Sequence, residues 1–273
     1  MRIVLAAVLL VACAACGPAG GSRSVVAAFY PLAYAAREVG GGAYTVHDLT
    51  PAGAEPHDVE LTPQAVAEIQ RAGVVLYLSH GFQPAVSDAV AHATGKRVDV
   101  LAGLPVRPSD PHVWLDPVLY ARIVRRVGLA LGRPRAAAAL GRRVLALDGA
   151  YRRGLAHCRR RSFVTSHAAF GYLAARYDLR QIAITGIDPE SEPSPQKLAS
   201  LAGLVRNAHI DTVFFERLVS PKLAQTVARE AGVRTAVLDP IEGLTPAEAG
   251  SGATYLSLMR RNLVALRQVL GCR

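Results

Sequence analysis

Short apolar runs alternate with helix-like segments along most of the chain, and this alternation limits the folds that it can adopt. The apolar runs cover residues 25–29, 44–49, 74–78, 97–101, 162–165, 181–185, 212–215 and 234–238. Four segments between them begin with a hydroxyl residue and a proline, at Thr62-Pro63, Ser194-Pro195, Ser220-Pro221 and Thr245-Pro246. A hydroxyl side chain caps free backbone N–H groups and proline fits the first helical position, so these pairs predict helix starts. Strands that alternate with helices form βαβ units with mostly parallel sheets, and the predicted fold class is therefore α/β.

The alternation stops once, between Asp116 and His157, where only helical spacing is found. In residues 135–157 the apolar side chains recur every three or four positions, at Ala136, Leu140, Val144, Leu147, Tyr151 and Leu155. This pattern predicts one amphipathic helix longer than ~30 Å that joins two lobes. We expect a leader and tether over residues 1–22, an N-terminal lobe over 23–133, a connecting helix over 134–158 and a C-terminal lobe over 159–273.

The first sixteen residues, MRIVLAAVLLVACAAC, resemble a signal for export. Arg2 precedes an apolar run that is too short to span a membrane but fits the centre of a secretory signal. The tetrapeptide LVAC that ends at Cys13 resembles the lipobox of bacterial lipoproteins, in which the cysteine is lipidated, and Cys16 is a second candidate. An ordinary cleaved signal is the alternative, and each interpretation predicts an exported protein.

Export affects the interpretation of the two remaining cysteines, Cys158 and Cys272. In an oxidising compartment an isolated cysteine pair is more often disulfide-bonded than metal-binding. We therefore predict a disulfide bond that closes a loop of more than a hundred residues and holds the C-terminal tail. Two buried free thiols are the alternative.

The formal net charge of +10 does not by itself indicate a nucleic-acid partner. Of the 31 basic residues 28 are arginine, which is typical of a GC-rich codon bias, and no nucleic-acid-binding motif is present. Basic residues spread over a fold affect solubility and long-range attraction, not a specific site. Five arginines, Arg152, Arg153, Arg159, Arg160 and Arg161, cluster at the end of the predicted connecting helix. They form either a solvated face or a contact with lipid headgroups or a membrane partner.

Three histidines and one aspartate lie just beyond predicted strands, where α/β sheets bind their ligands. They are His57 and His112 in the first half of the chain, and His167 and Asp239 in the second. Imidazole nitrogens with one carboxylate suit a divalent transition ion, and with Zn2+ such a site carries a net charge of about +1. Four protein ligands leave no open coordination position for water.

Seven short stretches of the chain follow one another in a recognisable order. They are FYPL from Phe29, PAGAEPHD from Pro51, DPHVWLDP from Asp110, TSHAAFGY from Thr165, ESEPSP from Glu190, Phe215-Glu216 with SPKLA from Ser220, and LDP from Leu238. In this order they resemble the metal-binding lipoproteins of bacterial ABC importers for zinc and manganese, the cluster A-I solute-binding proteins. The resemblance implies two α/β lobes joined by a backbone helix, with the metal held between the lobes.

The resemblance also implies the ligands, which fall on His57, His112, His167 and Asp239. Zinc-type members carry histidine at the third position and manganese-type members usually carry glutamate, so His167 indicates zinc. Residues 104–109 are short and lack the histidine-rich loop of many zinc-type members. Because the fourth position varies in the family, Glu55 or water are the alternatives to Asp239.

The expected function is the capture of Zn2+ outside the membrane and its delivery to an ABC permease in the cytoplasmic membrane. We expect a monomer that is lipid-anchored or periplasmic, catalyses no reaction and makes only small lobe rotations. Affinity for the ion should fall toward pH ~6, because ligand histidines must be neutral. The rivals are a manganese or iron carrier with the same fold, an exported zinc hydrolase with Glu55 or Asp58 as its base, and an adhesin in which the metal is structural.

Overall fold

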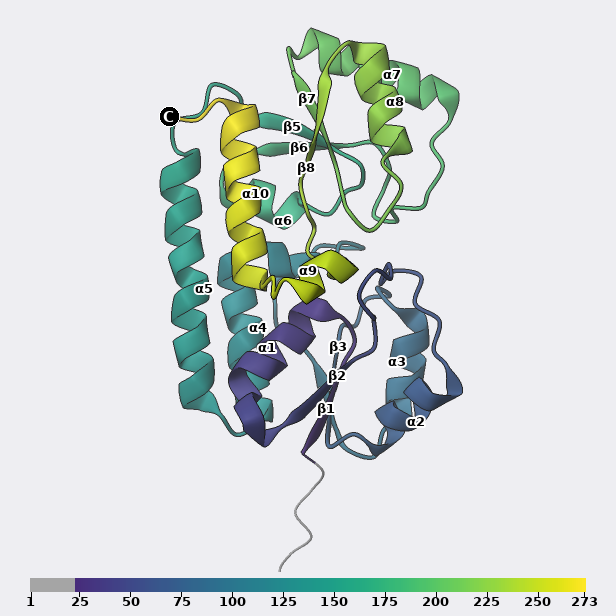
Figure 1. Cartoon of the computed structure of the whole chain (residues 1–273), viewed down its shortest axis with the longest axis vertical. Coiled ribbons are helices and arrows are strands. Elements are labelled where there is room, and N and C mark those ends of the chain that lie inside the picture. Colours follow the sequence, from purple (N-terminus) through teal and green to yellow (C-terminus); the bar gives the residue numbers. More distant parts are fainter. Residues whose placement is uncertain (1–22) are drawn as a thin grey trace, which may run out of the picture.

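Two parallel β-sheets form the centres of two lobes in the computed structural model, which describes residues 23–273 (Figure 1). The first sheet has the order β2-β1-β3-β4, with β1 at Ser24–Ala27, β2 at Thr45–Asp48, β3 at Val74–Tyr77 and β4 at Lys96–Asp99. The second sheet has the order β6-β5-β7-β8, with β5 at Ser162–Thr165, β6 at Arg180–Ala183, β7 at Thr212–Phe215 and β8 at Arg234–Val237. Within these two sheets every described strand pairing is parallel, which confirms the predicted α/β class. The predicted leader, with Cys13 and Cys16, lies outside the described residues.

Helices of the first lobe connect its strands and lie on both faces of its sheet (Figure 1). They are α1 (Tyr30–Gly40), α2 (Pro63–Arg71), α3 (Pro84–Ala91) and α4 (Pro117–Ala130), with short 3-10 turns η1 (Gly41–Ala43) and η2 (Val113–Leu115). Thr62 caps α2 as predicted, because its side-chain oxygen accepts a hydrogen bond from the Ala65 N–H at 3.2 Å. Asp116 caps α4 in the same way through the Val118 N–H.

The second lobe repeats this arrangement, with α6 (Gly171–Arg176), α7 (Pro195–Asn207) and α8 (Lys222–Ala231) around its sheet. The chain then returns to the first lobe at α9 (Pro246–Gly250) and runs back beside α5 to the second lobe through α10 (Tyr255–Leu270) (Figure 1). The Tyr255 ring stacks on Tyr120 of α4 at 4.0 Å between centroids, and its hydroxyl donates a hydrogen bond to the Trp114 carbonyl. The last helices therefore join the two lobes.

A single long helix, α5 (Pro134–Leu155), follows the side of both lobes and packs against α4 and α10 (Figure 1). Its buried stripe consists of Ala137, Leu140, Val144, Leu147, Tyr151 and Leu155. This is the predicted stripe, except that Ala137 and not Ala136 occupies the first buried place. One hydrophobic core includes residues of both sheets and of α5, so the exact domain boundaries at 133 and 158 stay a prediction.

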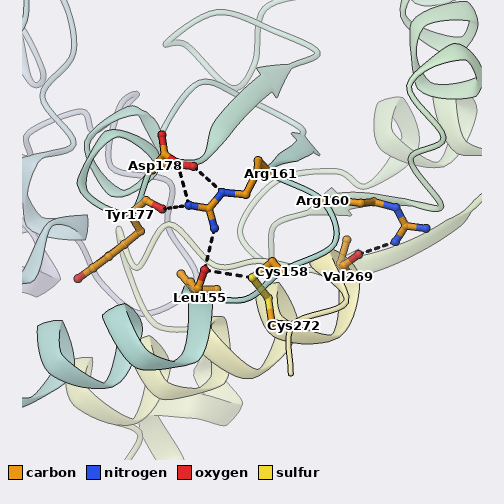
Figure 2. The surroundings of a disulfide bond; sticks show 8 residues. All are labelled: Leu155, Cys158, Arg160, Arg161, Tyr177, Asp178, Val269 and Cys272. Atoms are coloured by element: carbon orange, nitrogen blue, oxygen red, sulfur yellow. Dashed lines mark hydrogen bonds and ion pairs between the residues drawn. A yellow bond between two sulfur atoms is a disulfide. The ribbon is translucent and has the colours of Figure 1, made fainter.

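The predicted disulfide bond joins Cys158, just after α5, to Cys272, just after α10, across 114 positions of sequence (Figure 2). Two backbone hydrogen bonds, from Arg159 N–H to the Gly271 carbonyl and from Arg160 N–H to the Leu270 carbonyl, run beside it. The Arg161 guanidinium donates to the carbonyls of Leu155 and Tyr177. Part of the arginine cluster predicted at this place therefore has a structural role, because its guanidinium groups bind main-chain carbonyls.

Among the described helices, none has both the length and the apolar character that a bilayer crossing requires.

Candidate metal centre

His57, His112 and His167 meet between the lobes, as predicted from their positions beyond strand ends. His57 lies in the loop after β2, His112 in the loop after β4 and His167 in the loop after β5. The Nε2 atoms of His112 and His167 are 3.4 Å apart. His112 and His167 are buried, while the His57 side chain keeps 10% of its surface exposed. The parallel strand order places these carboxyl-end loops around one point.

Glu242 completes this group, and sequence reasoning did not find it. Its Oε1 atom lies 2.9 Å from the Nε2 of His112 and 3.4 Å from the Nε2 of both His57 and His167. One ligand atom from each of the four residues lies within 4.8 Å of all the others. Burial opposes ionisation of the Glu242 carboxyl, but the three histidines outweigh it and hold its pKa well below the ordinary value.

Asp239, the residue expected in the fourth position, is not brought into this group. Its Oδ1 accepts a hydrogen bond from the Ile241 N–H at 2.7 Å, and its backbone pairs with the Asn262 side chain. Ile241 has a positive φ of 58°, so the chain turns sharply between Asp239 and Glu242. Asp239 thus shapes the turn that presents Glu242. Burial raises the pKa of Asp239 to about 7.

Glu55, the alternative to Asp239, lies beside the group but is not part of it. Its Oε2 accepts a hydrogen bond from the His57 N–H at 2.8 Å, and its Oε1 is buried without a partner among the described residues. Burial, followed by repulsion from Glu242, raises the pKa of Glu55 to about 7. The contact to the His57 backbone holds the loop that carries this histidine.

Two carboxylates orient the buried histidines by contacting Nδ1, the ring nitrogen on the side away from the Nε2 atoms that meet at Glu242. Asp110 Oδ1 lies 2.9 Å from the Nδ1 of His112, and Glu216 Oε1 lies 2.8 Å from the Nδ1 of His167. A carboxylate at Nδ1 keeps the proton there and leaves the Nε2 lone pair directed at the centre. Burial opposes protonation of both rings, yet the neighbouring carboxylates outweigh it and raise the pKa of His112 and His167.

Contacts between loops also hold the backbone around the group, and one of them joins the two lobes. Trp114, two residues after His112, donates its indole N–H to the Pro240 carbonyl at 2.8 Å. Gln83 donates to the Pro56 carbonyl, next to His57, at 3.0 Å, and the Phe82 ring meets His57 edge-on at 4.6 Å. These contacts fix the backbone on both sides of the ligand atoms, so the group is preorganised.

Three imidazole nitrogens and one carboxylate oxygen form a donor set that suits Zn2+ in a tetrahedral arrangement. With every position filled by protein, such a centre has no site for an activated water. Two parallel α/β lobes, a long connecting helix and a buried group of three histidines and one glutamate between the lobes are features of the class of solute-binding proteins that bind metal ions.

The chain belongs to the family described as "Zinc-uptake complex component A periplasmic", ZnuA, whose model matches residues 25–269. This confirms the family that the seven sequence stretches indicate. It is 36% identical to the zinc-binding lipoprotein AdcA of Streptococcus pneumoniae over 97% of its own length and 59% of that protein's length. It is 31% identical to the high-affinity zinc uptake system protein ZnuA of Bacillus subtilis, over 98% and 96% of the two lengths. The chain thus spans about three-fifths of the AdcA relatives.

Solved structures with the same fold agree with this assignment. The Zn(II)-bound ZnuA-like domain of S. pneumoniae AdcA superposes with a TM-score of 0.80 at 36% identity, covering 92% of this chain and 99% of that domain. The laminin-binding protein Lmb of Streptococcus agalactiae, described as a bifunctional adhesin and metal transporter, superposes with a TM-score of 0.84 at 31% identity. It covers 90% of this chain and 99% of its own.

Proposed function

We propose that this protein is the extracytoplasmic zinc-binding component of an ABC metal importer. It captures Zn2+ between its lobes and delivers the ion to a permease in the cytoplasmic membrane. The observation that carries the proposal is the convergence of three Nε2 atoms on one buried oxygen of Glu242. Relatives that cover nearly the whole chain are named as zinc-binding or zinc-uptake proteins.

The proposed ligands are His57, His112, His167 and Glu242. This set keeps the three histidines expected from the sequence and assigns the fourth place to Glu242, while Asp239 holds the turn before it. Three neutral imidazoles and one carboxylate leave a net charge of about +1 on the zinc complex, which a buried centre tolerates better than a double charge.

Capture proceeds from the exposed side of the site inward. His57 is the only ligand whose side chain reaches solvent appreciably, so the ion meets it first. In the metal-free protein a proton shared among the buried histidines and Glu242 holds the group together, and Zn2+ displaces it on binding. Delivery starts with withdrawal of the His57 side chain, because carboxylates bind the Nδ1 atoms of His112 and His167, whereas the His57 ring has only Glu242 as a polar partner among the described residues.

Four protein ligands that leave no coordination position open favour transport over catalysis. A hydrolytic zinc site keeps one coordination position for water, and here four protein atoms fill a tetrahedral set. A histidine at the third position favours zinc over manganese, which prefers oxygen ligands. A monomeric, lipid-anchored form outside the cell membrane is part of the same proposal.

Metal content and competition on purified residues 23–273 test this function. We expect one equivalent of Zn2+ that excess Mn2+ does not displace. Glu242→Gln should weaken zinc binding strongly, while Asp239→Asn is the matched control, since asparagine keeps an oxygen for the Ile241 N–H. If Mn2+ competes with Zn2+ on equal terms, zinc selectivity is contradicted. If Asp239→Asn lowers zinc affinity more than Glu242→Gln does, the proposed ligand set is contradicted.

A further inference from the structure

The positive charge of the described chain is concentrated in one layer of helices. Helices α4, α5 and α10 contain eleven arginines and one acidic residue, Asp148, whereas the remaining described residues carry nineteen basic and twenty acidic side chains. α5 packs against both α4 and α10. In Figure 1 this layer lies on the side of the molecule opposite α2, α3, α7 and α8. The net charge is therefore a property of this layer and is not spread over the fold.

An apolar groove of about 450 Å3 lies between α4 and α5 on this layer. We call it the α4–α5 groove, and its lining residues include Leu129, Leu145, Arg125, Arg142, Ala138 and Gly141. Leu129 and Leu145 are 59% and 47% exposed and line the same groove, so they form part of one apolar surface. Within residues 23–273 neither Arg125 nor Arg142 has a carboxylate at ion-pair distance, whereas the adjacent Arg143 pairs with Glu38. The groove thus combines exposed leucines with unpaired cations.

The α4–α5 groove belongs to the end of the lobe at which residues 1–22 join the fold. The Arg23 carbonyl accepts a hydrogen bond from the Thr45 N–H, and the neighbouring Tyr44 hydroxyl donates to the carbonyl of Leu131, one residue after α4. Figure 1 shows the start of β1 and the α4–α5 turn at the same lower end. A lipid on Cys13 or Cys16 is ten or seven residues from Arg23, which spans roughly 23–36 Å when fully extended.

We propose that the α4–α5 groove docks on the anionic lipid surface of the membrane. Leu129 and Leu145 enter the interfacial region, and Arg125 and Arg142 bind lipid phosphates. Surfaces that combine basic and apolar side chains bind anionic bilayers in this way. The closeness of the groove to the bilayer depends on the proposed lipid anchor, because a short tether raises the effective concentration of the groove next to the membrane.

A second copy of the chain fits the groove less well than a lipid surface. A symmetric dimer through this face would bring Arg125 and Arg142 of both copies together without an acidic partner on either helix. α4 contains no acidic residue, and Asp148 of α5 already binds Arg152 at 2.9 Å. The charge therefore favours an anionic occupant.

Vesicle flotation with residues 23–273, which contain both sheets and the core but no lipidated cysteine, tests the proposal. The probes are vesicles of phosphatidylcholine alone and of phosphatidylcholine with about one-third phosphatidylglycerol. One variant is Arg125→Gln with Arg142→Gln, and a second is Leu129→Ser with Leu145→Ser. The matched control is Arg260→Gln with Arg267→Gln on α10, which removes the same charge from the same layer.

We expect the unchanged protein to bind the anionic vesicles only. The arginine double variant should lower the partition coefficient about 30-fold, and the leucine double variant should also lower it clearly. The control should change binding by less than about threefold. Zinc stoichiometry and the midpoint of thermal unfolding, measured on every variant, must stay unchanged, which separates this result from a failure of the metal-binding proposal.

Five outcomes would overturn the docking proposal. The first three are an absence of binding, equal binding to neutral vesicles, and an equal loss from the α10 control, which would mean that net charge alone acts. The fourth is displacement from the vesicles by inorganic phosphate at matched ionic strength, which would mean that the site binds a free anion. A dimer in sedimentation that the leucine variant dissociates would instead assign the groove to a second copy and equally contradict a lipid contact.

Discussion

The Nε2 atoms of His112 and His167 lie 3.4 Å apart, although 55 positions separate these residues and they follow strands of different sheets. Two ring nitrogens at this distance repel each other unless a proton or a cation lies near both. Glu242 Oε1 stands beside both rings and provides the opposite charge. The contact therefore defines a place where protons and a metal ion compete.

Zinc affinity should fall steeply as the pH decreases. Nearby carboxylates outweigh burial and raise the pKa of both His112 and His167, so in the metal-free protein these rings keep protons to a higher pH than free histidine. Zn2+ must displace those protons, and the apparent affinity rises with pH until both rings are neutral. Competition titrations between about pH 8 and pH 6 should show this trend together with proton release on binding. A pH-independent affinity would contradict it.

Removing metal should also change how stability depends on pH. A histidine with a raised folded pKa contributes stability that is present below its unfolded pKa and is lost as pH rises through the folded value. The metal-free protein should therefore lose free energy of unfolding as pH rises through the neutral range. Saturating Zn2+ should reverse this trend, since the ion binds the neutral rings of the folded state only. Denaturant unfolding with and without a chelator measures both slopes.

Glu216→Gln should weaken zinc binding without removing a ligand. Glu216 lies 2.8 Å from the Nδ1 of His167 and also binds the Ser166 hydroxyl. Loss of a carboxylate behind a metal-bound histidine typically costs 10–100-fold in affinity, and we expect a drop of about that size. Glu190→Gln, at an exposed position, is the control and should leave affinity unchanged. A similar loss in the two variants would show that overall charge, and not orientation of His167, matters.

Asp48→Asn should stabilise the protein at neutral pH and lose this effect in acid. Burial raises the pKa of the Asp48 carboxyl from 3.8 to about 6, so ionisation of Asp48 destabilises the folded state as pH rises through that range. Asparagine keeps the side-chain oxygen that accepts the Thr50 N–H at 3.2 Å and carries no charge. We expect a gain of ~1–3 kcal/mol in the free energy of unfolding above pH ~6 and almost none below pH ~4. Asp88→Asn, at an exposed position of α3, should change stability by less than ~0.5 kcal/mol at either pH.

Asp116 should contribute to stability through two separable interactions. Its Oδ1 caps α4, and its Oδ2 pairs with the Arg176 guanidinium of α6 at 2.6 Å. Asp116→Asn keeps the cap and removes the ion pair, which should cost ~1–3 kcal/mol because Asp116 is buried. Asp116→Ala loses the cap as well and should cost about 1 kcal/mol more. Equal effects of the two substitutions in denaturant unfolding would contradict a separate capping contribution.

The strands and most helices could be predicted because the signals are local. The runs expected at 44–49 and 97–101 became β2 and β4 within two residues at each end. Thr245-Pro246 predicted the start of α9, and Thr245 indeed caps it. At Ser220-Pro221 the helix starts one residue later than expected, because Pro221 itself occupies the N-cap position of α8. Such shifts depend on backbone angles that residue types do not determine.

The site was only partly predictable for a different reason. Each histidine follows a strand, and the edge of a parallel sheet collects such residues, so three of the four grouped residues could be found. Asp239 is the first carboxylate after β8 and was the natural choice for the fourth. The left-handed turn at Ile241 instead places the Glu242 side chain among the three histidines, and Asp239 stays outside the group. That turn is held by Asn262 of α10, more than twenty positions away, and has no signature in the local sequence.

The Cys158–Cys272 bond makes the whole second lobe, together with α9 and α10, a covalently closed ring. A protease outside the cell that cuts once anywhere inside this ring releases nothing, because both new ends remain attached through the sulfur atoms. Such a nicked molecule keeps its mass until a reductant separates the two pieces. The ring contains two of the four grouped residues, His167 and Glu242, and both remain in the molecule after a single cleavage of the chain between the two cysteines.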